Sequence, residues 1–418
     1  MTCAPATPPD LRALFDAQFH ASRAQPQVAL AVRRERLLRL RTLLEQHAPV
    51  LAAAVQADFG MRSARLTEVA DFFLLRALLA HTEAHLARWM RPRKVPTPWH
   101  LRPARAFIQR QPLGVVGVIS PWNYPIQLAL APAITALAAG NRVMLKPSEL
   151  TPHTSAQLAE LVGQFFVPEE FAVVQCDAAL AADFAALPFD HLVFTGSTAV
   201  GRQVAQAAAA QLTPTTLELG GKSPCILSAD ADMASAARKI AHGKLLNAGQ
   251  TCIAPDYLLL PHGHEAAFIA AYRAAVAQLF PTLWGNPDYA AILTPRHHAR
   301  LARLLQQAQS LGAQVQVIDP AQGQQAAAPG WGDAAQRQML PTLVWNVQPT
   351  MTLMQEEIFG PVITIYVYDD NKYEETLELC DRTSPYGLTG SIFARDRYAI
   401  DMAFNKLRYA AEIGRAHV

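Results

Sequence analysis

Short apolar segments rich in β-branched residues alternate with helical segments between residues 115 and 210. Strands are predicted at residues 115–119, 142–145, 172–175 and 191–194. Helices are predicted around the leucines before Gly140 and at residues 155–166 and 199–210. Because parallel strands need helical crossovers between them, this alternation predicts an α/β fold with a doubly wound parallel sheet. Ligands of such sheets bind at the carboxyl ends of the strands.

The segments on either side of this region have their own patterns. Residues 11–90 are predicted to be helical, because leucines recur at steps of three and four, as at Leu37, Leu40 and Leu44. A second α/β unit is predicted after residue 255 from one strand and two helices, at residues 257–260, 265–280 and 296–311. The two α/β units are therefore predicted to belong to two different domains.

Composition limits the partners and the location of the chain. Its 418 residues, 51% of them hydrophobic, suffice for a large core and two or three domains. A net charge of +2 gives no long-range field toward nucleic acid or an anionic membrane, so neither partner is expected. No apolar run approaches the ~20 residues of a membrane helix, and the start lacks a signal-peptide pattern. The five scattered cysteines fit free thiols, so a cytoplasmic location is expected.

A glutamate beside two glycines and a later cysteine form the candidate catalytic pair. Leu-Glu-Leu-Gly-Gly-Lys-Ser-Pro at residues 217–224 contains Glu218 and Gly220, and Gly-Gln-Thr-Cys ends in Cys252. A thiolate can attack a carbonyl, and a nearby carboxylate can take a proton from the thiol or from water. The double glycine allows close backbone approach. A buried cysteine and a helix-surface glutamate are the alternative interpretation.

The candidate phosphate-binding loop is Gly-Ser-Thr-Ala-Val-Gly at residues 196–201, since the sequence contains no Gly-x-Gly-x-x-Gly. The loop follows a predicted strand and opens a predicted helix. It therefore offers backbone N–H groups and the positive end of a helix dipole to an anion. A plain strand-to-helix turn is the alternative.

The histidines do not form a metal-binding pattern. His262 and His264, and the neighbours His297 and His298, lack a third ligand at metal spacing. Neither Cys-x-x-Cys nor His-Glu-x-x-His occurs in the sequence. We therefore predict no metal site.

Four further motifs follow the same order as those of a known family. They are Pro-Trp-Asn-Tyr-Pro at 121–125, Lys-Pro-Ser-Glu at 146–149, Phe-Thr-Gly-Ser-Thr at 194–198 and Glu-Glu-Ile-Phe-Gly-Pro at 356–361. Together with the glutamate and cysteine segments they resemble the aldehyde dehydrogenase superfamily. Up to about residue 361 the chain is most similar to its coniferyl aldehyde dehydrogenase branch. Several ordered motifs are far more specific than one short pattern.

This resemblance implies a division of the chain into parts. Residues 1–95 and 112–220 would form the NAD-binding domain, and residues 221–411 the catalytic domain. Residues 96–111 would form a hairpin that bridges subunits, and the native enzyme would be a homodimer or a tetramer. On the residues alone, 106–110 alternate only weakly and indicate a strand.

The resemblance also implies a dinucleotide site, with NAD as the cofactor and NADP left open. Its residues would be Pro121, Trp122, Lys146, Glu149, Gly196, Ser197, Gly201, Gly220, Glu357 and Phe359. Ser197 would contact the pyrophosphate, Lys146 and Glu149 the adenosine ribose, and Glu357 and Phe359 the nicotinamide ribose and ring. An acidic residue at Glu149 favours a free 2′-hydroxyl. Without the resemblance, Lys146 and Glu149 would be an exposed ion pair, and Glu357 part of a helix-start charge pair.

The implied reaction converts a small-molecule aldehyde to a carboxylic acid. Cys252 would attack the aldehyde, with the oxyanion held by the Asn123 amide and the backbone N–H of Cys252. Hydride transfer to the nicotinamide would leave a thioester, and Glu218 would activate the water that hydrolyses it. Taken alone, Asn123 fits a turn amide equally well.

The C-terminal part has a different amino-acid composition from the rest of the chain. Six of the ten tyrosines lie after residue 360, and Thr-Ser-Pro-Tyr-Gly-Leu-Thr-Gly at 383–390 resembles 1-pyrroline-5-carboxylate dehydrogenase. We hypothesise a chimera joined within residues 356–361, with residues 362–411 from that branch. Residues 412–418 match a translated sequencing adapter, so we expect an artefact there and a catalytic domain that is incomplete. The alternatives to coniferyl-type activity are therefore glutamate-semialdehyde dehydrogenase and an inactive fragment that only binds dinucleotide.

Overall fold

The computed structural model describes residues 10–176, 178–321, 331–383 and 387–414. The predictions that fall on residues 384–386 and 415–418 therefore lie outside the described residues. The chain forms two compact units: Met1–Asp58 with Ala64–Glu218, and Phe59–Ser63 with Leu219–Val418. The first unit ends at Glu218, two residues before the predicted boundary, and a five-residue segment near residue 60 belongs to the second unit.

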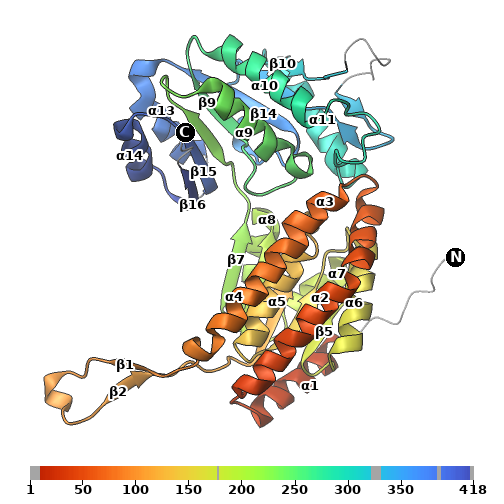
Figure 1. The fold of residues 1–418 in the computed structure, drawn as a ribbon, viewed down its shortest axis with the longest axis vertical. Coiled ribbons are helices and arrows are strands. Elements are labelled where there is room, and N and C mark those ends of the chain that lie inside the picture. The colour runs from red at the N-terminus through yellow and green to blue at the C-terminus, as the bar shows by residue number, and fades with distance from the viewer. Residues whose placement is uncertain (1–9, 177, 322–330, 384–386, 415–418) are drawn as a thin grey trace. The chain divides into compact units, whose positions relative to one another are not determined.

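The first unit is built on a five-stranded sheet with the order β5-β4-β3-β6-β7 (Figure 1). Its strands are β3 (Val115–Ile119), β4 (Arg142–Lys146), β5 (Phe171–Val173), β6 (His191–Gly196) and β7 (Thr215–Leu219). Strands β3 to β6 are parallel, and Ile119 of β3 is in register with Lys146 and Phe194. The chain runs from β3 outward to β5 and then returns to β6 beside β3. The predicted α/β fold is confirmed, with a switch in strand order between β3 and β6.

Helices surround this sheet and precede it. They are α1 (Leu11–Ala24), α2 (Leu30–Phe59), α3 (Ala64–Thr67), the π-helix η1 (Glu68–Phe73), α4 (Leu74–Trp89), α5 (Gln127–Ala138), α6 (Pro152–Phe165), α7 (Ala178–Ala185) and α8 (Thr198–Ala210). The periodic leucines of α2 are buried, as their spacing predicts. Helices α1 and α5 both pack against β3 and β4.

Helix α6 begins three residues before the predicted start at residue 155. The carboxylate of Asp58, from the distant end of α2, accepts hydrogen bonds from the backbone N–H groups of His153 and Thr154. This cap satisfies donors at the helix start, where Pro152 occupies the first turn. The prediction was wrong at this end because the cap comes from outside the local sequence.

A two-stranded antiparallel hairpin, β1 (Arg93–Val95) with β2 (Ala106–Ile108), extends from the first unit (Figure 1). It begins three residues before the predicted segment 96–111. Its turn contains the short 3₁₀ helix η2 (Trp99–Leu101). Large apolar side chains are exposed along it, with Trp99 83% and Phe107 60% accessible. Such a hairpin has unpaired strand edges and an apolar surface.

The second unit is built on a seven-stranded mixed sheet with the order β10-β13-β14-β9-β8-β15-β16. The strands are β8 (Pro224–Leu227), β9 (Tyr257–Pro261), β10 (Gln314–Val317), β13 (Thr342–Trp345), β14 (Val362–Tyr368), β15 (Gly387–Phe393) and β16 (Tyr409–Gly414). Only β10 pairs antiparallel, with β13, among these described strands. The small ladder β11 (Gly332–Asp333) with β12 (Gln338–Met339) stands apart.

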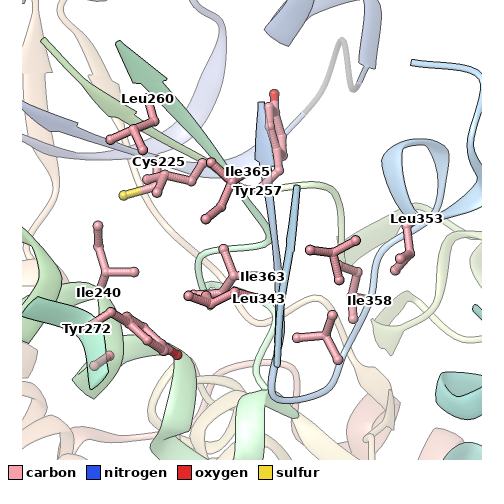
Figure 2. Packing of buried hydrophobic residues seen from close by; sticks show 14 of the residues in the cluster. Cys225, Ile240, Tyr257, Leu260, Tyr272, Leu343, Leu353, Ile358, Ile363 and Ile365 are labelled. Carbon is pink, nitrogen blue, oxygen red and sulfur yellow. The ribbon is translucent and has the colours of Figure 1, made fainter. Parts of the chain in front are cut away.

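Helices of the second unit complete its core. They are α9 (Met233–Leu245), the 3₁₀ helix η3 (Leu246–Gly249), α10 (Glu265–Leu279), α11 (Pro295–Ser310), α12 (Thr352–Gln355), the 3₁₀ helix η4 (Asp370–Lys372), α13 (Tyr373–Thr383) and α14 (Arg397–Lys406). Figure 2 shows Ile240 of α9 and Tyr272 of α10 in one cluster with Leu343 and Ile363 of the sheet. Because this core is closely packed, it holds the strands, and the loops at their ends, in fixed positions.

The C-terminal part joins the same sheet. Strand β15 is in register with β8, and β16 pairs parallel with β15 through Gly414. The first three residues of the segment expected to be an artefact therefore continue a strand. Its proposed origin, and the chimera, stay predictions. Among the described residues, no helix is long and apolar enough to cross a membrane.

Candidate active site

Cys252 follows a loop whose backbone is unusual. Asn247, Ala248 and Gly249 have φ angles of 52°, 51° and 74°, so three consecutive residues adopt the left-handed conformation. Non-glycine residues rarely adopt it, and such geometry persists only where the surroundings enforce it. Of the four cysteines within the described residues, Cys176, Cys225 and Cys380 are buried, and Cys252 alone is partly exposed.

Hydrogen bonds from two buried amides enforce this loop. The Gln250 Nε2 donates to the carbonyl oxygens of Asn247 and Ala291, at 3.0 Å each, and its Oε1 accepts from Leu293 N–H at 2.9 Å. The Asn247 Nδ2 donates back to the Gln250 carbonyl at 3.3 Å. The Asn247 Oδ1 accepts from Arg62 Nη1 at 3.2 Å, in the segment 59–63. The residues before Cys252 are therefore held on several sides.

Two close approaches connect this loop to its neighbours. A Cβ on Gly249 would lie 2.2 Å from the carbonyl oxygen of Gly360, so only glycine fits. On the other side, the Ser223 hydroxyl donates to the carbonyl of Cys252 at 3.4 Å. The glutamate, cysteine and Glu-Glu-Ile-Phe-Gly-Pro motifs thus meet through their backbones within the second unit.

Three buried ionisable groups and one partly buried carboxyl lie beside this loop. Lys222 Nζ is 2.7 Å from Asp256 Oδ2 and also donates to the Glu356 carbonyl at 3.0 Å. Lys244 Nζ lies 3.5 Å from the other carboxylate oxygen of Asp256. Asp256 also accepts from the backbone N–H of Ile358 at 3.2 Å. Two lysines therefore share one aspartate, and Glu357 stands next to them.

The carboxyl group of Glu357 packs against the double glycine. A Cβ on Gly220 would lie 2.3 Å from a Glu357 carboxylate oxygen, so Gly220 makes room for this side chain. Burial, and then the charge of Asp256, raise the pKa of Glu357 to about 8. The Gly221 N–H, Lys222 and Lys244 oppose the rise. Arg300 fixes the backbone here, donating from Nη2 to the Glu357 carbonyl at 2.6 Å.

Phe359 follows Glu357 in a left-handed turn with φ of 57°. Its side chain is partly buried. Arg300 Nη1 donates to the preceding Ile358 carbonyl at 2.9 Å and so holds this turn. Contacts within the second unit therefore bring Gly220 together with Glu357, and Ser223 together with Cys252.

In the first unit, Lys146 and Glu149 meet at the end of β4. Lys146 Nζ is 3.0 Å from Glu149 Oε2 and also donates to the Pro147 carbonyl at 3.2 Å. Burial would raise the pKa of Glu149, but its own backbone N–H and Lys146 outweigh this and lower it. Because its pKa is lowered, the Glu149 carboxylate is ionised at neutral pH. Lys146 is buried whereas Glu149 is exposed, so this carboxylate is also accessible.

The loop after β6 leads directly into α8. Ser197 is its N-cap residue, and its hydroxyl accepts from Val200 N–H at 3.4 Å. Gly196 ends β6, and Gly201 is buried in the first turn of α8. The helix is long enough to present a positive N-terminal end. It starts beside the switch in strand order, where ligands of open α/β sheets bind.

The loop after β3 lies on the other side of that switch. Pro121 and Trp122 are partly buried, and Asn123 is buried with 3% of its surface accessible. The loop ends where Asp71, from η1, accepts a hydrogen bond from Gln127 N–H at 2.9 Å. Glu218 is exposed on β7. Asn123 and Glu218 belong to the first unit and Cys252 to the second, so their convergence stays a prediction.

Several residues of this site were missed by sequence reasoning. Asn247 and Asp256 show no pattern in sequence that distinguishes them from other loop residues, and Gln250 was noted only as part of the Gly-Gln-Thr-Cys segment. Lys244 does have a signal: it lies on the same face of α9 as buried Ala237, Ile240 and Ala241. A lysine inside an apolar stripe is an anomaly that periodicity could have found.

Both units are α/β sheets whose strand-end loops carry the candidate residues, which is the arrangement of nucleotide-dependent α/β enzymes. The Aldehyde dehydrogenase family model matches residues 1–414, and the chain belongs to this family. It is therefore an oxidoreductase of a family that uses NAD(P) to oxidise aldehydes.

Individual relatives agree with this assignment. The chain is 46% identical to a coniferyl aldehyde dehydrogenase of Pseudomonas sp. (strain HR199 / DSM 7063), over 88% of this chain and 75% of the relative. It is similar in structure to a substrate-bound AldH of Staphylococcus aureus, with a TM-score of 0.89, 30% identity and coverage of 98% and 86%. A P. syringae AldA in complex with NAD+ and IAA has a TM-score of 0.83, 26% identity and coverage of 97% and 80%.

Proposed function

We propose that this chain oxidises an aromatic aldehyde of the coniferyl type to its carboxylic acid through a thioester on Cys252. The single observation that carries the proposal is the loop before Cys252, where three left-handed residues and buried amides hold one partly exposed thiol. The similarity to coniferyl aldehyde dehydrogenase supports the substrate class. Glutamate semialdehyde is the second candidate, favoured by the segment at residues 383–390.

The dinucleotide would be held by residues from both units. In the first unit, Lys146 and Glu149 offer a donor and an acceptor for ribose hydroxyls, and Ser197 and Gly201 open the helix that would face the pyrophosphate. Pro121, Trp122 and Gly196 would contact the same cofactor. In the second unit the residues are Gly220, Glu357 and Phe359. Bound dinucleotide supplies a hydride acceptor.

The residues of the chain carry the remaining chemistry. The Cys252 thiolate bonds to the aldehyde carbon, and the Asn123 amide with the Cys252 N–H holds the resulting oxyanion. After oxidation the acyl group remains on Cys252 as a thioester. Glu218 then takes a proton from water, whose oxygen attacks the thioester, releasing the acid and the thiolate.

The ionised, accessible carboxylate of Glu149 supports NAD over NADP as the cofactor. A 2′-phosphate would meet a like charge there, whereas a free 2′-hydroxyl can donate to the carboxylate. Replacing Glu149 by Gln removes the repulsion. We expect the ratio of kcat/KM values for NAD and NADP to fall by roughly tenfold in Glu149→Gln. An unchanged ratio would remove Glu149 from this role.

The function is tested by NADH formation with coniferaldehyde and with glutamate semialdehyde, using the full chain. We expect turnover of coniferaldehyde, its loss in Cys252→Ala, and accumulated acyl-enzyme, visible by mass spectrometry, in Glu218→Gln. Asn123→Ala should lower kcat by about 10²–10³-fold. Turnover retained in Cys252→Ala would refute the nucleophile, and a preference for glutamate semialdehyde would establish the second candidate.

We further propose that the hairpin of β1 and β2 binds a second copy of this chain. Its exposed apolar side chains, Trp99, Phe107 and Ile108, and its unpaired strand edges support such a role. The result would be a homodimer or a tetramer.

A further inference from the structure

Arg62, in the segment 59–63 of the second unit, is buried beside the turn that precedes Cys252. Only 1% of its surface is accessible, and its guanidinium lies over the ring of Phe59, 4.6 Å from the ring centroid. Its Nη1 donates to Asn247 Oδ1 at 3.2 Å. A buried guanidinium loses hydration energy, so packing alone would favour an apolar residue at this position. The contact with Asn247 indicates what the cation is needed for.

The side-chain amide of Asn247 has an oxygen at one end and a nitrogen at the other, and the two ends bind different partners. Arginine has donors and no acceptor, so the amide oxygen must face Arg62. The amide nitrogen then faces the carbonyl of Gln250 and donates to it at 3.3 Å. In the reversed orientation, nitrogen would face the guanidinium and oxygen would face the carbonyl, so neither hydrogen bond could form. Arg62 therefore selects the orientation in which Asn247 closes the turn.

The turn from Asn247 to Gln250 depends on this closure. The Gln250 N–H donates to the Asn247 carbonyl at 3.1 Å, and the Gln250 Nε2 donates to the same carbonyl at 3.0 Å. Asn247 and Ala248 have positive φ angles, a conformation that persists only where surrounding contacts enforce it. Cys252 follows Gln250 by two residues, so the position of its thiol depends on this turn.

The backbone around Arg62 is fixed to the second unit by contacts that do not use its side chain. The Met61 carbonyl accepts from Ala291 N–H at 2.9 Å. The Phe59 carbonyl accepts from Arg337 Nη2 at 2.8 Å. These hydrogen bonds remain when the guanidinium is removed, so the loss falls on the amide that the guanidinium binds.

We propose that Arg62 is a positioning residue for Cys252, because its guanidinium orients the Asn247 amide that closes the turn before the thiol. This inference rests on the proposed function, in which the Cys252 thiolate attacks the aldehyde. Arg62 acts through Asn247 and not on the reacting atoms. Without the guanidinium the turn loosens and the thiol is less well placed, and a displacement of ~1 Å can lower a rate by about 10²-fold.

The test combines steady-state kinetics of the full chain, with coniferaldehyde and NAD, and hydrogen exchange of the peptide that covers residues 246–252. In Arg62→Met, which keeps an apolar stem over Phe59, we expect kcat to fall by about 10–100-fold with KM for NAD unchanged. Amide hydrogens of the turn should exchange faster. Arg62→Lys keeps a donor and should recover part of kcat. Arg65→Met, which changes an exposed arginine of α3, is the matched control and should leave both measurements unchanged.

A double-mutant cycle tests the route through Asn247. Asn247→Gly accommodates a positive φ but has no side-chain amide, so kcat should fall as it does in Arg62→Met. If Arg62 acts through this amide, adding Arg62→Met to Asn247→Gly should lower kcat no further. Arg62→Gln replaces Arg62→Met if that variant does not fold. Glutamine offers both a donor and an acceptor, so it no longer selects the amide orientation, and kcat should again fall.

A lower melting temperature, with kcat of the folded Arg62 variants unchanged, would overturn the inference. A loss of kcat that Arg62→Lys does not recover, or that adds to the loss in Asn247→Gly, would overturn it as well. No turnover by the unaltered chain would refute the proposed function. Hydrogen exchange of the turn needs no substrate and would still decide the role of Arg62, since unchanged exchange in Arg62→Met would exclude it.

Discussion

At the scale of single residues, the buried carboxyl of Glu357 makes the stability of the second unit depend on pH. Its pKa is about 8 in the folded chain, against an ordinary 4.5. Between these values the folded chain holds a proton that the unfolded chain releases, so stability falls as pH rises through this window. The loss of stability that comes from ionising Glu357 is complete above about pH 8.

Replacing Glu357 by Gln removes this titration. We expect Glu357→Gln to exceed the unaltered chain in free energy of unfolding above pH 8, by about 1–2 kcal/mol, because water still reaches part of the side chain. The difference should vanish toward pH 4.5. Urea denaturation at the two ends of the window measures it. Equal pH dependence in the two proteins would contradict the pKa of Glu357.

The exposure of Cys252 predicts selective alkylation. Among the described cysteines, iodoacetamide should modify Cys252 well before Cys176, Cys225 and Cys380, because those three thiols are buried. Burial also raises the pKa of Cys225 far above its ordinary value. Peptide mass spectrometry after brief treatment identifies the modified site, with Cys252→Ala as the control. Faster modification of Cys225 would show that the packing around it is open.

Sequence reasoning selects candidate residues that belong to local motifs, and their roles stay predictions. Glu218, Cys252 and Glu357 were selected from their neighbours in sequence. Asp256 was missed, since its importance arises from contacts with residues that are distant along the chain. The left-handed conformation of Ala248 has no sequence signal either, because alanine favours ordinary helix.

At the scale of elements, the turn before Cys252 depends on Gly249. Its φ of 74° and the 2.2 Å from its Cβ position to the Gly360 oxygen both exclude a side chain. We expect Gly249→Ala to destabilise the chain by about 2–3 kcal/mol and to abolish turnover. Thermal unfolding and NADH formation measure the two effects.

Gly163 offers a matched control for this substitution. It lies in α6, is exposed, and a Cβ there would meet nothing within 4 Å. Gly163→Ala should therefore stabilise the chain by about 0.5–1 kcal/mol through better helix propensity, with activity unchanged. If Gly249→Ala and Gly163→Ala changed stability and turnover equally, the close approach of Gly249 to Gly360 would not explain the loss expected in Gly249→Ala.

Element positions were predictable where periodicity is local. The strand at residues 115–119 was placed correctly at both ends, and β4, β5 and β6 were placed within two residues, whereas β7 was not predicted. The start of α6 was placed too late because its cap, Asp58, is remote. The π-helix η1 was not predicted, since an extra residue in a helical turn leaves no distinct hydrophobic pattern.

At the scale of the whole molecule, the hairpin predicts association. We expect the chain to have the mass of a dimer or tetramer by light scattering, and Phe107→Ser with Ile108→Ser to shift it toward smaller species. Leu38→Ser, equally apolar and exposed but on α2, is the control and should leave the mass unchanged. A monomer in all three proteins would contradict the role of the hairpin.

The segment 59–63 has a consequence for recombination. This segment belongs to the second unit. Arg62 donates a hydrogen bond to Asn247, and the carbonyls of Met61 and Phe59 accept hydrogen bonds from Ala291 N–H and from Arg337. An exchange of gene segments at residue 218 would separate this short loop from Asn247, Ala291 and Arg337. The turn before Cys252 would then be supported by residues of a different parent. A crossover within residues 356–361 keeps all these partners from one parent, so it preserves the contacts of segment 59–63.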